Sequence, residues 1–250
     1  MKTITITNQK GGVGKTTTVL ALASGLAHKG YRVLAVDLDP QSNLTYSTGT
    51  TDSENNIYAL LTGKIDFRTP LKKGKQGFHV IPGSINLANA DREFNETGRE
   101  YILKEALEPL KNEFDYCIID TPPSLSILPI NALTSSSGVI VPMNTDIYSL
   151  QGLEQLYRLV QKVRKYSNPE LKIEGLLLTQ YKPRSIINRQ IKEQLECIAA
   201  QMETKVFQST IREAIAMKEA LFMQTDIFTE LPKAKVTGDY KSFIDEFLGV

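Results

Sequence analysis

The chain has 250 residues, of which 41% are hydrophobic and 23% charged, and its formal net charge is only +1. This composition excludes a disordered or fibrous protein and predicts one α/β domain over residues 1–250, long enough to bury a substantial core. Neither half of the chain is strongly basic, which excludes a uniformly basic nucleic-acid binder, so any such contact must come from a local patch.

Strand and helix patterns alternate in chain order. An alternation of apolar and polar residues predicts a strand at Thr3–Thr7. Further strand-like runs, several of them nearly all apolar, lie at Val33–Asp37, Phe78–Ile81, Tyr116–Asp120, Gly138–Pro142 and Leu176–Thr179, with a weaker one at Lys205–Phe207. Periodic patterns predict helices at Lys15–His28, Arg99–Asn112, Leu128–Thr134, Leu150–Tyr166, Ile187–Met202, Ile211–Phe222 and Asp239–Leu248. The region 48–77 is the least regular, with one short helix near 57–62. We expect a doubly wound, mostly parallel sheet of about seven or eight strands with helices on both faces.

The N-terminus and the cysteines bear on location. The chain begins with a strand pattern rather than a charged and then apolar leader, and no apolar run approaches the roughly 20 residues needed to cross a bilayer. Cys117 and Cys197 lie far apart without a C-x-x-C motif, so both are expected to be reduced packing residues. We therefore expect a cytoplasmic protein without integral membrane association.

A phosphate-binding loop follows the first strand. It consists of Lys10, Gly11, Gly12, Val13, Gly14, Lys15, Thr16 and Thr17. Small residues let successive backbone N–H groups face a phosphate chain, Lys15 adds a cation, and the Thr16 hydroxyl can ligate Mg²⁺. The following helix directs its positive N-terminal end at the same phosphates. The loop is a variant, because Gln9 replaces the usual first glycine and Lys10 adds a second lysine, which suggests a different target for that cation.

Acidic residues stand where two predicted strands end. Asp37 and Asp39 lie two residues apart before Pro40, and Asp120 ends the apolar run Tyr116–Asp120. Ligands of open α/β sheets bind at this edge, and a terminal Asp usually carries the water-mediated Mg²⁺ contact in P-loop enzymes. The alternative role of a helix cap loses weight when a phosphate-binding loop and two such strands occur together.

These residues suffice for phosphoryl transfer to water, which consists mainly of positioning and charge neutralisation. Lys15 and the loop amides would hold the phosphates, Thr16 and Asp120 the metal, and Asp39 would orient the attacking water. The two histidines, His28 and His79, are expected to serve as a cap or in packing rather than in catalysis.

Residues 10–17, 37–41 and 120–123 together resemble the ParA/Soj branch of the deviant Walker A ATPases, and later segments such as 81–84, 149–153 and 176–181 extend the resemblance over the chain. The resemblance implies a P-loop NTPase fold, ATP and Mg²⁺, and a homodimer that sandwiches ATP. In it Lys10 would reach the partner subunit's nucleotide, Asp39 would support hydrolysis, and Asp37 and Asp120 would support the metal.

The resemblance also implies a function in DNA segregation. ATP-bound dimers of such proteins bind double-stranded DNA non-specifically on the nucleoid, and a ParB-type adaptor stimulates hydrolysis and releases them. Arg184 matches a basic position of the family, Lys218 lies two residues after Ala216, where an arginine is frequent, and Gln180 and Pro183 match positions near the nucleotide base. Further candidates for DNA contacts are Arg189, Lys192 and Arg212.

Four alternatives stay open at this point. A membrane-cycling regulator resembling MinD would need a basic amphipathic C-terminal helix, whereas residues 239–250 carry more acid than base. A positioning ATPase of the same family could act on a protein cargo. An electron-transfer ATPase resembling the nitrogenase iron protein would need cysteines placed for a cluster, and a nucleotide-gated scaffold would not need intact Lys15, Asp39 and Asp120.

Overall fold

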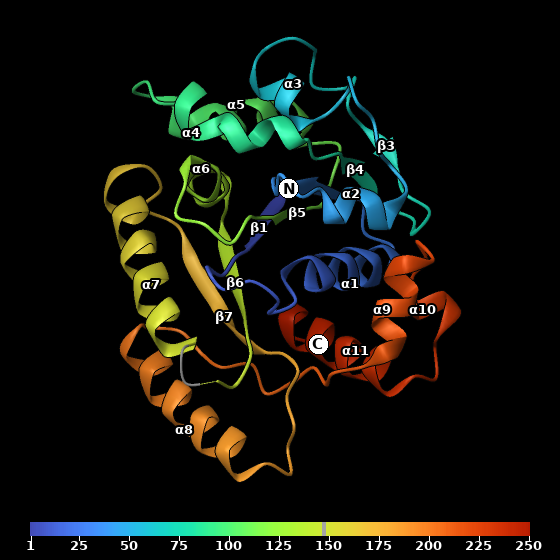
Figure 1. The fold of residues 1–250 in the computed structure, drawn as a ribbon, viewed down its shortest axis with the longest axis vertical. Coiled ribbons are helices and arrows are strands. Elements are labelled where there is room, and N and C mark those ends of the chain that lie inside the picture. The colour runs from blue at the N-terminus through green and yellow to red at the C-terminus, as the bar shows by residue number, and fades with distance from the viewer. Residues whose placement is uncertain (147–148) are drawn as a thin grey trace.

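A seven-stranded sheet in the order β3-β4-β2-β5-β1-β6-β7 organises the chain (Figure 1). The computed structural model describes residues 1–146 and 149–250. The strands are β1 (Lys2–Ile6), β2 (Val33–Asp37), β3 (Lys72–Lys73), β4 (His79–Ile81), β5 (Tyr116–Asp120), β6 (Gly138–Met143) and β7 (Lys172–Leu178). All pairs are parallel except β3 with β4, so the predicted doubly wound, mostly parallel sheet is confirmed.

Helices cover both faces of the sheet. They are α1 (Lys15–His28), α2 (Asn43–Thr48), α3 (Ile57–Leu61), α4 (Ala90–Glu93), α5 (Ile102–Leu107), α6 (Ile127–Ser135), α7 (Ser149–Tyr166), α8 (Ile186–Gln201), α9 (Ile215–Phe222), α10 (Ile227–Glu230) and α11 (Lys235–Leu248). Short 3-10 helices lie at Ile85–Asn89, Arg99–Tyr101 and Glu108–Leu110.

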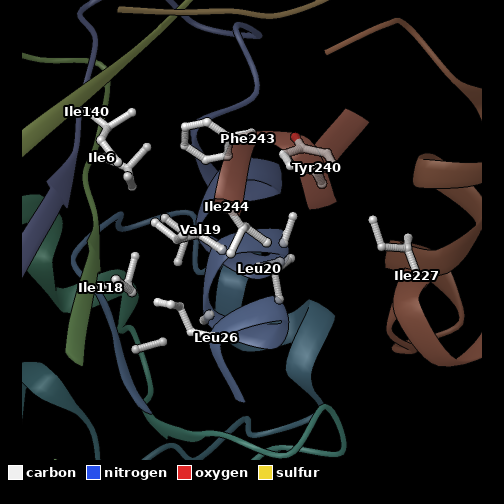
Figure 2. Close-up of a cluster of buried hydrophobic side chains, with 14 of the residues drawn as sticks. Ile6, Val19, Leu20, Leu26, Ile118, Ile140, Ile227, Tyr240, Phe243 and Ile244 are labelled. Atoms are coloured by element: carbon white, nitrogen blue, oxygen red, sulfur yellow. The ribbon is translucent and has the colours of Figure 1, made fainter. Parts of the chain in front are cut away.

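One face of the sheet packs against α1 and α11, with α9 and α10 beside them (Figure 1). Because side chains alternate along a strand, Ile118 of β5 faces this layer while its neighbours face the other. Figure 2 shows Ile244 of α11 beside Val19 and Leu20 of α1, with Phe243 in the same cluster. The helix that begins at the phosphate-binding loop is therefore held between the sheet and the C-terminal helix.

The opposite face carries two further clusters of apolar side chains. Cys117 and Ile119 of β5 pack with α3, α5 and α6, and Val139 and Val141 of β6 pack with α7 and α8. With both faces covered, β2, β5 and β6 are mostly apolar and were readable as nearly continuous runs, whereas β1 alternates threonine with isoleucine.

Several boundaries differ from the prediction. The weak strand predicted at 205–207 is wrong, because Val206 makes only an isolated bridge to Leu176. The strand predicted at Leu176–Thr179 begins earlier than expected, since β7 starts at Lys172. The helix predicted from Arg99 is divided into three pieces, the last of which contains Pro109. The helix predicted from Ile211 begins only at Ile215, because the backbone N–H of Ile211 donates to the Leu178 carbonyl and its own carbonyl accepts from Tyr181.

Candidate functional site

The carboxyl ends of β1, β2 and β5 converge at one edge of the sheet. The strand β5 lies between the other two, with Ile6 opposite Asp120 on one side and Asp37 opposite Asp120 on the other. Two of the predicted acidic residues are therefore register neighbours although they are far apart in sequence. The phosphate-binding loop leaves β1 at the same edge, so the topology brings the two groups together.

The loop curls by left-handed backbone at two glycines. Gly12 has φ 74° and Gly14 has φ 83°, and a Cβ atom added at Gly12 would meet nothing within 4 Å. The Nζ of Lys15 donates a hydrogen bond across the loop to the carbonyl oxygen of Lys10 at 3.0 Å. The loop thus holds its cation inward, and its conformation is one that glycine favours.

Burial and nearby carboxylates act in opposite directions on the pKa of Lys15. Its side chain is only 7% exposed, and this desolvation lowers the pKa of the ammonium while the charges of Asp120 and Asp39 oppose the shift. Thr16 donates a hydrogen bond of 2.6 Å from its hydroxyl to the Oδ2 of Asp120. Two of the three residues expected to support a metal ion, Thr16 and Asp120, are therefore in direct contact.

The carboxylate of Asp120 is buried, with one oxygen left without a hydrogen bond in the described parts of the chain. It is fully buried, and its Oδ1 has no hydrogen-bond partner within the described ranges. Burial raises the pKa of this carboxyl well above its ordinary value, and the neighbouring Asp37 raises it further. An orphaned carboxylate oxygen beside a threonine hydroxyl fits Mg²⁺, which takes oxygen ligands.

The protein offers few ligands of its own to that ion. Across residues 1–146 and 149–250 there is no group of three or more His, Cys, Asp or Glu side chains arranged to hold a metal. Mg²⁺ commonly keeps several waters and binds through one or two protein groups together with substrate phosphates. The sparse donor set of Thr16 and Asp120 agrees with that mode.

Asp37 and Asp39 have different surroundings. Asp37 is fully buried and accepts hydrogen bonds from the backbone N–H of Asp39 and from the N–H and hydroxyl of Thr45, at 3.1, 2.9 and 2.6 Å. Burial raises the pKa of Asp37 to about 6. Asp39 accepts a hydrogen bond of 3.0 Å from the N–H of Gln41, and its side chain lines the cleft described next.

A cleft of about 590 Å³ opens over the loop, and we call it the P-loop cleft. Its lining consists of Gly11, Gly12, Gly14, Lys15, Thr16, Thr17, Asp39, Gln41, Asn43, Tyr46, Ser47, Pro123, Gln180, Lys218, Leu221 and Phe222. Val13 is buried behind the loop, where its carbonyl accepts a hydrogen bond from Thr179. Gln180 donates a hydrogen bond of 2.9 Å to the Gly12 carbonyl, so this side chain contacts the loop itself.

A second concavity of about 680 Å³, the basic groove, adjoins the cleft. It is lined by Tyr181, Lys182, Pro183, Arg184, Arg212, Glu213, Ile215 and Lys218. Lys218 lines both concavities. Pro183, which the resemblance placed near the nucleotide base, lies in the basic groove and not in the lining of the P-loop cleft.

The five basic residues predicted to contact DNA are not equivalent. Arg184 and Lys218 line the basic groove, whereas Arg189 and Lys192 lie on α8 outside its lining. The guanidinium of Arg212 is bound by both carboxylate oxygens of Asp239 at 2.6 and 2.8 Å. Its charge is therefore largely balanced within the chain.

Sequence reasoning missed several residues of the site. Thr45 binds Asp37, and Asn8 accepts a hydrogen bond from the backbone N–H of Lys10 at 3.0 Å. Asn144 and Asp146, which follow β6, contact the side chain of Lys10. Asn8, Asn144 and Asp146 all follow the ends of parallel strands, so the rule that found Asp37 and Asp120 would have found them.

Comparison with known proteins gives consistent results. A family model described as an AAA domain matches residues 1–173. The sporulation initiation inhibitor protein Soj of Bacillus subtilis is 43% identical over 223 residues, which cover 88% of this chain and 87% of Soj. The chromosome partitioning protein ParA of Caulobacter vibrioides is 36% identical over 226 residues, which cover 88% of this chain and 84% of ParA.

Among solved structures, cobyrinic acid a,c-diamide synthase of Mycobacterium smegmatis, with bound ATP analog and magnesium, has a TM-score of 0.85 to this chain. The two are 34% identical, and the match covers 99% of this chain and 94% of the other. The similarity therefore includes both the sheet and α9, which lines the P-loop cleft.

Proposed function

Because this chain belongs to the ParA/Soj family of P-loop ATPases, we propose that it hydrolyses ATP with Mg²⁺ and acts as a molecular switch in DNA segregation. In this proposal the ATP-bound chain forms a homodimer that binds double-stranded DNA non-specifically on the nucleoid. A ParB-type adaptor stimulates hydrolysis and so releases the dimer. The chain would work in the cytoplasm, and no helix in its described parts has the length and apolar character to cross a membrane.

The P-loop cleft is the observation that carries the chemistry. Lys15, Thr16 and Asp39 line one concavity, and the orphaned oxygen of Asp120 lies behind Thr16. Loop amides and Lys15 would bind the phosphates, and Asp39 would orient a water molecule for attack. Thr16 and Asp120 would hold Mg²⁺, which supplies charge neutralisation at the phosphates.

The make-up of the cleft supports slow intrinsic turnover. No arginine is among the residues that line the P-loop cleft in the described parts of the chain. An arginine that stabilises the transition state is worth about 10³–10⁵ in rate in related phosphoryl transfers. Stimulation by a partner is thus the natural point of control, and the adaptor fits that role.

The basic groove supports DNA as the matrix. Arg184 and Lys218 line it next to the P-loop cleft, and Lys218 contributes to both. Non-specific DNA binding depends mainly on such contacts with phosphates. A membrane matrix has less support, because Tyr240, Phe243 and Ile244 on α11 are buried in the core and are not available to a lipid surface.

The decisive experiment uses Asp39→Ala, which should bind ATP and dimerise but not hydrolyse. Binding to a non-specific duplex is measured with ATP, ADP or no nucleotide over a salt series, with the molecular mass determined in each state. We expect tight, salt-sensitive binding only by the ATP dimer. Lys15→Ala, which should lose nucleotide binding, is the matched control.

Other outcomes would change the proposal. Binding to DNA without ATP, or in no state, would count against a partitioning switch. An ATP dimer that ignores DNA would keep the chemistry and move the matrix to a protein or membrane surface. Native turnover by Asp39→Ala would show that another group orients the water.

A further inference from the structure

The side chain of Lys10 is engaged within its own chain. Its Nζ donates a hydrogen bond of 3.2 Å to the Oδ1 of Asn144 and forms an ion pair with the carboxylate of Asp146. Both partners follow β6 at the edge of the sheet where the phosphate-binding loop begins. The second lysine of the loop is thus turned toward β6 in the isolated chain.

The groups that hold Lys10 are themselves fixed. The hydroxyl of Ser149, at the start of α7, donates to Asn144 at 2.9 Å and to Asp146 at 3.1 Å, and its backbone N–H donates to Asp146 at 3.1 Å. On the other side, Asn8 accepts from the Lys10 N–H and donates to the Pro142 carbonyl at 2.8 Å. Asn144 and Asp146 therefore receive the ammonium, Ser149 of α7 holds both of them, and Asn8 fixes the backbone of Lys10.

We propose that Asn144 and Asp146 form an intramolecular latch that withholds Lys10 in the free chain and opposes formation of the ATP dimer. The proposal rests on the proposed function, in which Lys10 reaches the nucleotide of a second copy. One ammonium cannot satisfy Asp146 and a phosphate of another subunit at the same time. The free energy needed to release Lys10 from Asp146 then opposes dimerisation. Asp146 is a positioning residue that acts through Lys10.

The exposure of the pair fixes the size of the effect. The side chains of Lys10 and Asp146 are 31% and 38% exposed, so solvent screens their attraction. Exposed pairs of this kind change equilibria by about twofold to fivefold. The latch is therefore weak enough for bound ATP to open, yet strong enough to bias the isolated chain.

The first test measures access to Lys10 without requiring dimerisation. Nucleotide-free protein is treated with an amine-acylating reagent, and labelling of Lys10 is followed by peptide mass spectrometry. In Asp146→Asn the amide oxygen can still accept from Ser149 while the charge on Lys10's partner is lost. We expect Lys10 to be labelled about twofold to fivefold faster. An unchanged rate would overturn the latch.

A remote pair provides the control. Lys29 and Asp245 form an ion pair of 2.7 Å with side chains 40% and 45% exposed, at the end of α1 and on α11. Asp245→Asn should accelerate labelling of Lys29 and leave Lys10 unchanged. Equal acceleration of Lys10 in both variants would indicate general loosening of the fold and overturn the assignment to Asp146. Circular dichroism and the Tm of Asp146→Asn check that α7 is intact.

The second test connects the latch to assembly. In the Asp39→Ala background, Asp146→Asn should lower the protein concentration at half-dimerisation with ATP about twofold to fivefold, without an effect in ADP. Unchanged or weaker dimerisation would show that the latch does not oppose assembly. If Asp39→Ala alone forms no ATP dimer, the proposed function fails together with this consequence, and the labelling result still decides whether Asp146 holds Lys10.

Discussion

Asp37 and Asp120 make the empty site electrostatically costly. Both are fully buried, and the pKa of Asp37 rises from 3.8 to about 6 while that of Asp120 rises well above its ordinary value. Between about pH 4 and pH 6 the folded chain therefore binds more protons at Asp37 than the unfolded chain does. The free energy of unfolding contributed by this group consequently falls as the pH rises through that window.

Asp120→Asn should stabilise the protein in the absence of nucleotide and metal. It removes a buried charge, and the remaining amide oxygen can still accept the hydrogen bond from Thr16. We expect a higher Tm at pH 8, by about 2–4 °C for each kcal/mol regained, and a shallower loss of stability as the pH rises above 4. Stabilisation by ATP with Mg²⁺ should be weakened in the same variant. Thermal denaturation over a pH series measures all three effects.

The control for that prediction is a carboxylate whose pKa is lowered in the folded protein. Asp115 is partly exposed, and its hydrogen bond with Arg32 lowers its pKa to about 2. Asp115→Asn should lower the Tm or leave it unchanged. A lower Tm for Asp120→Asn at pH 8 would show that the buried charge of Asp120 does not destabilise the empty protein.

At the residue scale, the sequence predicted the groups that carry charge and missed those that orient them. Asp37, Asp39 and Asp120 were readable because each ends or follows an apolar strand. Thr45 and Ser149 were not, because a hydroxyl in a helical turn has no pattern of its own and gains its role only from what lies opposite. The pairing of Arg212 with Asp239 joins two segments whose proximity only the fold creates.

At the scale of elements, α11 supports the helix that carries the phosphate-binding loop. Phe243 is fully buried, and its ring meets that of Phe207 edge-on with centroids 5.0 Å apart. Figure 2 shows the same side chain in the cluster that includes Val19 and Leu20 of α1. Stability of the loop thus depends on a helix near the other end of the chain.

Phe243→Ala should lower the free energy of unfolding by about 3–5 kcal/mol, because it leaves a cavity in this cluster. Denaturant unfolding measures the loss. Phe222→Ala is the matched control, since that ring is 76% exposed and should cost little. Comparable losses in the two variants would contradict the role assigned to α11.

Element boundaries were less predictable than element order. The central strands were readable from apolar runs or, for β1, from alternation, but β3 has only two residues, both lysines, and no apolar signal. Residues 205–207 have a strand-like composition, yet only Val206 bridges to β7. Ile211 stays outside the helix because its backbone forms hydrogen bonds with Leu178 and Tyr181, which the local sequence does not encode.

At the scale of the whole molecule, a net charge of +1 gives DNA little general attraction. DNA binding must therefore depend on the basic groove. The salt dependence of the DNA affinity is expected to scale with the number of phosphates that the groove neutralises. Arg184→Ala with Lys218→Ala should weaken binding by the ATP dimer and reduce the salt slope by about one for each lost contact. Duplex binding between low and moderate salt measures the slope.

Arg212→Ala tests a basic residue of the same groove that is already paired with a carboxylate. Because Asp239 already balances the guanidinium, this change should alter the salt slope little and reduce stability only slightly. If Arg212→Ala reduces the slope as much as the double variant, Asp239 must release the arginine when DNA binds.

The position of β5 between β1 and β2 has a consequence for how the chain is made. A ribosome delivers β1, the phosphate-binding loop and β2 well before β5, so the two early strands have no central partner to pair with until residue 120 has emerged. Sheets that depend on such distant pairings form slowly, and incomplete chains expose their strand edges. Arrested nascent chains that end before β5 should therefore be sensitive to proteases and unable to retain nucleotide, although the whole loop is already outside the tunnel.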